Sequence, residues 1–240
     1  MVVEILYPEF ITFGEIETVH YFDLIAKEHE HLEIIKTFYH DEPYFANHSV
    51  DLIFFGPMTE KNMERVYNKL LPYKSLLKNL IDDGIKILAI NNSLDLLGSD
   101  LEVIDGKPAS CLGLFPYKTV RDFSNRVSEQ VLIEFQGELA YGSKLGFSNY
   151  YGNENNYLYK SLHPEHAFNL DSPLGGYKYK NSYLIELSGN ILITNPCFLN
   201  LLKILLEIDA ELPFESDLNF VYKENLRLLK KVKGFGVYFD

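Results

Sequence analysis

The segment Ile85–Gly98 constrains the fold more than any other stretch of this chain. An aliphatic run over Ile85–Ile90 stops at the polar turn Asn91–Ser93, and apolar residues at helical spacing follow over Leu94–Leu97. This pattern predicts a buried strand that turns sharply into a helix. A bend of this kind holds one residue up at the end of the strand, the geometry called a nucleophile elbow. That residue is Asn91, which tolerates the left-handed backbone region but is not a nucleophile.

Strand-like and helix-like segments alternate over the first hundred residues, which implies right-handed crossovers and parallel strands. The pattern predicts strands over Val2–Tyr7, Glu33–Tyr39, Ser49–Phe55 and Ile85–Ile90, and helices over Glu15–Glu28, Glu60–Leu71 and Lys74–Asp83. Later strands are predicted in an antiparallel region, over Gln130–Phe135, Tyr141–Tyr150 and Tyr183–Glu186. We therefore expect a single α/β domain over residues 1–240, with a mainly parallel central sheet flanked by helices and an antiparallel extension in the C-terminal half.

The charge balance is acidic, with 34 Asp and Glu against 22 Lys and Arg and a formal net charge of −12. Such a balance argues against nucleic acid and anionic membranes as partners, because both favour basic surfaces. Two cysteines, Cys111 and Cys197, are too few for a disulfide framework. No signal peptide or apolar stretch of about 18 residues is evident in the sequence. We expect a soluble cytoplasmic protein.

Several segments, taken in order, resemble the landmarks of a class I glutamine amidotransferase domain. Val50–Gly56 resembles the strand before the oxyanion loop of that family, and Leu77–Gly98 resembles its helix, strand and elbow. Further matches are Asn125-Arg126 with an Asn-Arg step, Leu145–Tyr151 with Gly-Phe-Glu-Asn-His, and Ile191–Pro196 with Tyr-Leu-His-Gly-Pro. The resemblance is to the cobyric acid synthase type and to the lipid II glutamine amidotransferase subunit that partners a Mur-ligase-like protein. It implies the flavodoxin-like α/β fold of that class.

The matched positions depart from the family at each catalytic element. Asn91 stands where the family has its cysteine nucleophile, and Thr194 stands where it has its histidine base. Gly56 is followed by Pro57, which has no N–H group, where the family has consecutive glycines that donate to an oxyanion. The resemblance therefore implies the fold without glutaminase activity and without a cofactor. The implied role is a scaffold or regulatory subunit of a ligase-like or synthase partner.

The former active-site cleft is the expected place for a ligand, a small amide or amino acid that is held without hydrolysis. The residues that match this cleft or lie beside it in the sequence are Gly56, Asn91, Asn92, Arg126, Ser148, Asn149 and Thr194.

Three other interpretations stay open at this level. An enzyme with a relocated nucleophile would use Cys197 at the start of a predicted helix, with Cys111 and Ser93 as weaker candidates. A small-molecule binding protein would use a pocket lined by the tyrosines between residues 150 and 183. The histidines of His163-Pro164-Glu165-His166 are weak candidates for metal ligands, and an exposed loop is the favoured interpretation.

Overall fold

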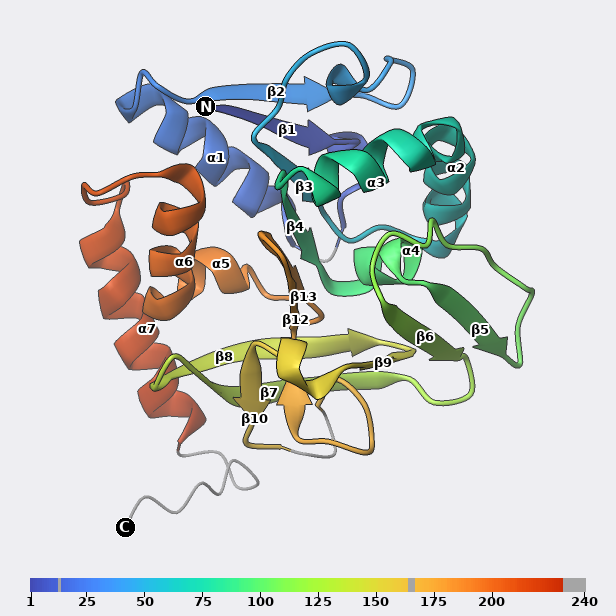
Figure 1. Cartoon of the computed structure of the whole chain (residues 1–240). Coiled ribbons are helices and arrows are strands. Elements are labelled where there is room, and N and C mark those ends of the chain that lie inside the picture. Colours follow the sequence, from blue (N-terminus) through green and yellow to red (C-terminus); the bar gives the residue numbers. More distant parts are fainter. Residues whose placement is uncertain (13, 164–166, 231–240) are drawn as a thin grey trace.

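The computed structural model describes residues 1–12, 14–163 and 167–230. Its central sheet has six strands in the order β12-β13-β4-β3-β1-β2 (Figure 1). The strands are β1 (Val2–Leu6), β2 (Glu33–Thr37), β3 (Leu52–Phe55), β4 (Lys86–Ile90), β12 (Tyr177–Tyr179) and β13 (Ser182–Ile185). Every neighbouring pair is parallel except β12 with β13. The mainly parallel sheet predicted from the sequence is confirmed.

Helices cover both faces of this sheet, so its strands are buried on both sides. They are α1 (Ile16–Glu28), α2 (Glu60–Leu70), α3 (Lys74–Asp82), α4 (Leu94–Leu97), α5 (Ile191–Thr194), α6 (Pro196–Leu206) and α7 (Glu215–Leu229). In β4, Leu88 and Ile90 join the core on the side of α1 and α6, whereas Ile87 and Ala89 join the core on the side of α2 and α3. Burial on both faces explains why β4 is a continuous aliphatic run.

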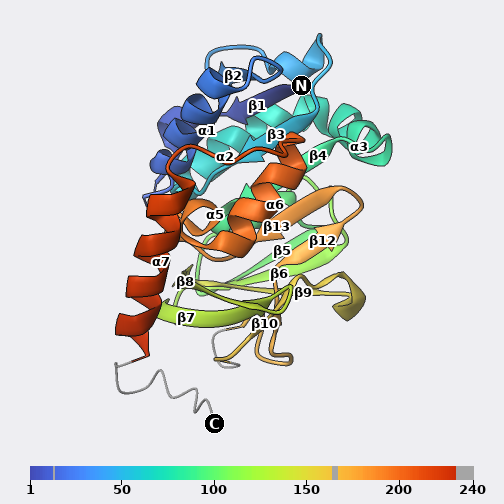
Figure 2. The same cartoon turned by 90° about the vertical axis from the view of Figure 1, so that its left-hand side faces the viewer.

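The antiparallel extension is confirmed and consists of two smaller sheets beside the central one, in which every pair is antiparallel except β5 with β6 (Figure 2). One has the order β5-β6-β9, from β5 (Asp100–Ile104), β6 (Tyr117–Asp122) and β9 (Ser148–Gly152). The other has the order β11-β10-β7-β8, from β7 (Val127–Phe135), β8 (Glu138–Gly146), β10 (Tyr159–Ser161) and β11 (Leu174–Gly175). β7 and β8 form a hairpin whose two turn residues, Gln136 and Gly137, both have positive φ.

Two predicted strands are placed differently by the structure. Tyr183–Glu186 was expected in the antiparallel region, but β13 lies in the central sheet, parallel to β4 and antiparallel only to β12. Tyr141–Tyr150 was expected as one strand, but the chain breaks at Phe147 into β8 and β9, which belong to different sheets. Short apolar runs indicate strands but do not specify which strand they pair with, because the pairing partner is set by tertiary contacts.

No helix within the described part of the chain is both long and apolar enough to span a bilayer.

Candidate functional site

Asn91 forms the bend between β4 and α4 that the sequence predicts. Its φ is 53°, in the left-handed region, and the residue is 2 % exposed. The side-chain amide Nδ2 donates to the carbonyl oxygen of Leu145 at 3.0 Å and to that of Glu186 at 3.2 Å. These carbonyls belong to β8 and to the residue after β13. Asn91 therefore ties together two strands at the position where a nucleophile elbow presents its reactive group.

The segment Gly56–Met58, which matches the oxyanion loop, is occupied by contacts within the protein. The Met58 N–H donates to Oδ1 of Asn92 at 3.1 Å, and Nδ2 of Asn92 donates to the Met58 carbonyl at 2.7 Å. A Cβ on Gly56 would lie 2.7 Å from the side chain of Ile11, so that side chain fills the space over the glycine. Pro57 has no N–H and that of Met58 is in use, so neither of the two residues after Gly56 presents a free donor to a developing oxyanion.

Thr194 lies in α5 and not after a strand, so its predicted match to the family's histidine base is wrong. Gly189 and Asn190 both have positive φ, and their N–H groups each donate to Oε1 of Glu15 at 2.9 Å. This capped turn starts the helix, in which the Thr194 hydroxyl donates to the Asn190 carbonyl at 3.1 Å. The residue that directly follows the strand beside β4 is Glu186. The short run Gly189–Ile193 did not reveal that turn, because isolated apolar runs of this length fit a strand or a helix.

We call the space between Asn91 and Glu186 the elbow cleft. Strand β8 lies across it. The backbones of Ser143 and Ser188 exchange two hydrogen bonds of 2.9 Å, which fixes β8 against the segment after β13. The remaining cavity has a volume of about 10 Å³ and is lined by Asn92, Lys144, Leu145, Gly146, Phe147, Ser148, Tyr150 and Glu186. A cavity of this size has room for about one water molecule. This cavity by itself is too small for the amide or amino acid expected there, and a neighbouring cavity of about 70 Å³ shares Asn92, Leu145, Gly146, Phe147 and Ser148 with it.

The sequence did not point to two buried charged groups, which are Lys144 on β8 and Glu186 directly after β13. Lys144 is 5 % exposed, and its ammonium donates to the Ala167 carbonyl and, at 3.5 Å, to Oδ1 of Asn149. Burial lowers the pKa of Lys144 to about 8. Glu186 accepts from the Tyr159 hydroxyl and from the Gly176 N–H, and burial raises the pKa of its carboxyl group while the charge of Lys144 opposes that rise. Neither residue stands in a motif, so only the fold reveals the pair.

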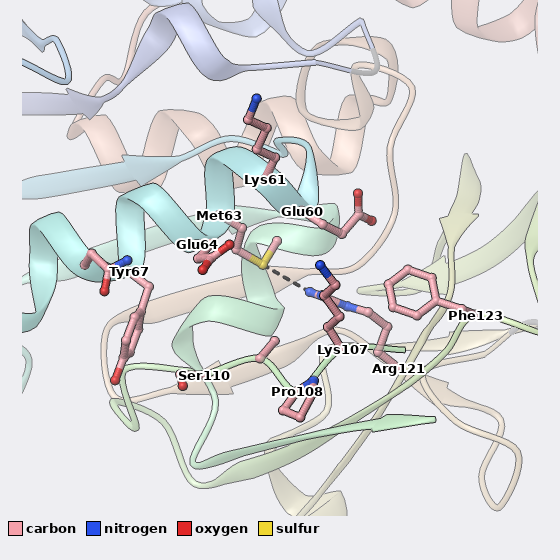
Figure 3. Close-up of a pocket in the computed structure, with 12 residues that line it drawn as sticks. Glu60, Lys61, Met63, Glu64, Tyr67, Lys107, Pro108, Ser110, Arg121 and Phe123 are labelled. Carbon is pink, nitrogen blue, oxygen red and sulfur yellow. Dashed lines mark hydrogen bonds between the residues drawn. The ribbon is translucent and has the colours of Figure 1, made fainter. Parts of the chain in front are cut away.

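A second buried pair joins α4 to β6. Nε and Nη2 of Arg121 donate to Oδ2 of Asp95 at 3.0 and 2.7 Å, and the side chains are 4 % and 1 % exposed. The same Oδ2 accepts from the Ser148 hydroxyl at 2.8 Å, and Nη2 of Arg121 also contacts Sδ of Met63 at 3.1 Å (Figure 3). Ser148, a predicted ligand-binding residue, thus holds the ion pair. Three hydrogen bonds to one buried carboxylate oxygen make this a rigid element of the site.

Beside this pair, a groove of about 420 Å³ opens between α2 and the 107–110 segment (Figure 3). We call it the α2 groove. Its lining residues are Glu60, Lys61, Met63, Glu64, Tyr67, Asn68, Lys107, Pro108, Ala109, Ser110, Arg121 and Phe123. A cavity of about 70 Å³ shares Glu60 and Arg121 with the groove and is also lined by Asn92, Arg126 and Ser148. The structure therefore brings together three of the predicted ligand-binding residues, and these lie beside the groove, whereas Thr194 lies in α5.

The candidate nucleophiles are not poised for attack. Cys197 is 1 % exposed in α6, and burial raises the pKa of its thiol to about 12, so the thiolate is scarce near pH 7. Burial also raises the pKa of Cys111. The Ser93 hydroxyl donates to the carbonyls of Ile90 at 2.8 Å and Phe55 at 3.2 Å, both inside the core.

The metal-site candidates are only partly described. His163 lies within the described residues, whereas His166 lies outside them. Among the described residues, no group of three or more His, Cys, Asp or Glu side chains is arranged to hold a metal ion.

The fold is similar to solved glutamine amidotransferase structures. One from Thermotoga maritima aligns with a TM-score of 0.50 at 13 % identity, over 98 % of this chain and 93 % of that one. Another glutamine amidotransferase aligns with a TM-score of 0.57 at 12 % identity, over 85 % and 99 %. The glutaminase domain of Trypanosoma brucei CTPS with bound acivicin aligns with a TM-score of 0.54 at 8 % identity, over 89 % and 96 %.

Comparison of the sequence does not assign the chain to a family, since neither a family model nor a curated protein matches it. Identities of this order establish shared architecture and not shared chemistry. The six-stranded, mainly parallel sheet and its antiparallel additions match those structures across most of the chain. This chain therefore has the α/β fold of class I glutamine amidotransferase domains.

Proposed function

We propose that this chain is a non-catalytic glutamine amidotransferase-like protein that acts as a scaffold or regulatory subunit of an ATP-dependent, ligase-like partner. The observation that carries the proposal is the backbone conformation and hydrogen bonding of Asn91. Its amide occupies the elbow position with φ 53° and bonds two backbone carbonyls, so the bend is kept while its reactive group is replaced by a structural one.

Two neighbouring features support the loss of glutaminase chemistry. The Asn92 side chain forms hydrogen bonds with both the N–H and the carbonyl of Met58, so that N–H group is not free to donate to an oxyanion. Residues 186–190, which follow the strand beside β4, read Glu-Leu-Ser-Gly-Asn and contain no histidine. With β8 fixed over the cleft, glutamine has no nucleophile to meet there, and the cavity beside Glu186 is by itself too small for it.

The subunit role rests on the sequence resemblance to the cobyric acid synthase type and to the lipid II glutamine amidotransferase subunit. In that family the domain serves a ligase or synthase partner, and this chain keeps the fold of such a domain. Both cysteines are free thiols, in accord with the cytoplasm as the expected compartment.

Ammonia release from glutamine tests the catalytic part of the proposal. The wild-type protein, Cys197→Ala and Asn91→Cys are compared with an active amidotransferase as the positive control. We expect no release above background from any of the three, because restoring the thiol at position 91 leaves the oxyanion donors and the base missing. Release by the wild type that disappears in Cys197→Ala would instead establish a relocated nucleophile.

Affinity purification from the native host tests the partner. The tagged wild-type chain is expected to retain an ATP-dependent ligase-like protein that a tagged, unrelated acidic domain of similar size does not retain. Absence of such a protein from repeated captures would overturn the subunit role and leave the catalytic conclusion standing.

A further inference from the structure

The α2 groove is built from two walls that differ in charge. One wall is the first half of α2, which carries the carboxylates of Glu60 and Glu64 and also Lys61. The other wall carries Lys107 and Arg121, from the segment after β5 and from β6. Figure 3 shows these side chains around one hollow, with Tyr67 toward one end and Phe123 toward the other. The groove thus combines acidic, basic and aromatic surfaces.

The charges on the two walls do not neutralise one another. Among the described residues, neither Glu60 nor Glu64 lies within 4.0 Å of a cation, and Lys107 lies within that distance of no carboxylate. Arg121 is already paired with Asp95, so the unpaired charges that face the hollow are those of Glu60, Glu64 and Lys107. Such charges leave favourable positions for ligand groups of the opposite sign.

Arg121 gives the basic wall a fixed geometry. Nε and Nη2 are held by Asp95 and Met63, and the guanidinium lies 5.9 Å from the centre of the Phe123 ring. No hydrogen bond from Nη1 occurs within the described ranges, so that nitrogen is left to bind a ligand. Phe123 also packs on Gly106, where a Cβ would lie 2.5 Å from the ring, and this close approach sets the path of the chain into Lys107. The Arg121 guanidinium is therefore held in place before a ligand binds, whereas Lys107 is an exposed side chain.

We propose that the α2 groove binds a small zwitterion with an apolar or aromatic body, of the size of a dipeptide. A carboxylate of the ligand would meet Lys107 and Arg121, and its ammonium group would meet Glu60 and Glu64. A purely anionic molecule would face two carboxylates, and a purely cationic one would face Lys107 and Arg121, so a molecule with both charges fits best. The volume of about 420 Å³ lies within the range of roughly 300–1,000 Å³ usual for ligand sites. This inference does not depend on the loss of glutaminase activity.

Calorimetric titration with three forms of one probe tests the charge requirement. The forms are the dipeptide alanyl-phenylalanine, its N-acetyl derivative, which lacks the positive charge, and its C-terminal amide, which lacks the negative charge. We expect measurable binding of the free dipeptide and binding weaker by about tenfold or more for each blocked form. Equal binding of the free and N-acetyl forms would overturn the zwitterion in favour of a simple anion, and no binding of the free dipeptide at millimolar concentration would overturn the site.

Matched variants locate the site. Lys107→Gln is expected to weaken the free dipeptide about tenfold without changing the affinity of the amide, because the amide has no carboxylate to lose. Glu64→Gln is expected to weaken binding of the free dipeptide about tenfold without changing the affinity of the N-acetyl form, because that form has no ammonium group to lose. Lys69→Gln is the control, since Lys69 lies on α2 but does not line the groove. Affinities unchanged in both groove variants would show that the dipeptide binds elsewhere and would overturn the proposal.

Discussion

The elbow cleft and the α2 groove lie close together, and they use their polar groups in opposite ways. In the cleft, Asn91, Asn92 and Glu186 bond to nearby backbone and side chains, although Oδ1 of Asn91 and Oε1 of Glu186 have no hydrogen-bond partner among the described residues. A cavity of about 10 Å³ remains there, beside one of about 70 Å³. In the groove, Glu60, Glu64 and Lys107 stand unpaired around about 420 Å³. Polar groups that satisfy one another stabilise a fold, whereas unpaired opposite charges around a hollow suit a ligand. The comparison teaches that the polar side chains at the elbow are tied into the fold, whereas those of the groove face open space.

Arg121 is the residue at which the two regions meet. It lines the groove and the 70 Å³ cavity that also contains Asn92, and it is fixed by Asp95 on α4, directly after the elbow. Substitutions in the two regions should therefore differ in how much they lower the free energy of unfolding. The largest loss is expected at Arg121, which both regions share.

Arg121→Met should have the largest effect. It leaves the Asp95 carboxylate buried without its partner, for which a loss of about 3–5 kcal/mol in the free energy of unfolding is expected. Urea denaturation measures it. Arg121→Met combined with Asp95→Asn is the control, since removing both charges should recover part of the loss. A single variant as stable as the wild type would mean that the pair does not anchor the site.

Lys144→Met tests the buried charges of the elbow cleft through pH. The pKa of Lys144 is about 8 in the folded protein and about 10.4 in an unfolded chain. Between these values the unfolded state binds more protons, so this group makes the wild type more stable as pH rises. The free energy of unfolding of the wild type should rise by up to about 3 kcal/mol, relative to that of Lys144→Met, between about pH 7.5 and about pH 10.5.

Denaturant titrations of both proteins across that range measure the gain, and the tyrosines common to both cancel in the difference. A difference that stays constant with pH would show that Lys144 keeps an ordinary pKa in the folded protein.

Substitutions at Asn91 should have the next largest effect. Asn91→Ala removes the two hydrogen bonds to Leu145 and Glu186 and keeps a Cβ at φ 53°, so a loss of about 2–3 kcal/mol is expected. Asn91→Gly loses the same bonds but relieves the backbone strain, and should be about 1 kcal/mol more stable than the alanine variant. Equal stabilities of the two would mean that the bend carries no strain. Thermal unfolding ranks them.

The elbow shows what the sequence could predict, and Thr194 shows where it failed. A strand, a polar turn and a short apolar helix are local patterns, so Asn91 was predicted correctly at the bend. Ile191–Pro196 was matched to a family segment in which the histidine follows a short strand, yet the carboxylate of Glu15, about 175 positions away, caps the turn that starts a helix here. The helical turn depends on a contact that no local window contains.

The buried charges were missed for a related reason. Lys144 and Glu186 are far apart in the sequence, as are Asp95 and Arg121, and each reads as an ordinary surface residue until the antiparallel sheets fold over α4. The groove lining likewise comes from α2, the segment after β5 and β6, which only the tertiary fold brings together. Sequence patterns therefore predicted the strands β1 to β4 of the central sheet and the elbow, and could not predict the groove.

Lys107→Gln and Glu64→Gln should have the smallest effect on stability, and that outcome sharpens the comparison most. Both side chains are exposed and unpaired, so each substitution is expected to change the free energy of unfolding by less than about 0.5 kcal/mol. Thermal and urea unfolding of the ligand-free variants measure this beside Lys69→Gln. A loss above about 1 kcal/mol in either variant would show that the groove charges support the fold, as those of the elbow cleft do. Unchanged stability together with weakened dipeptide binding would mean that these charges act on a ligand and not on the fold.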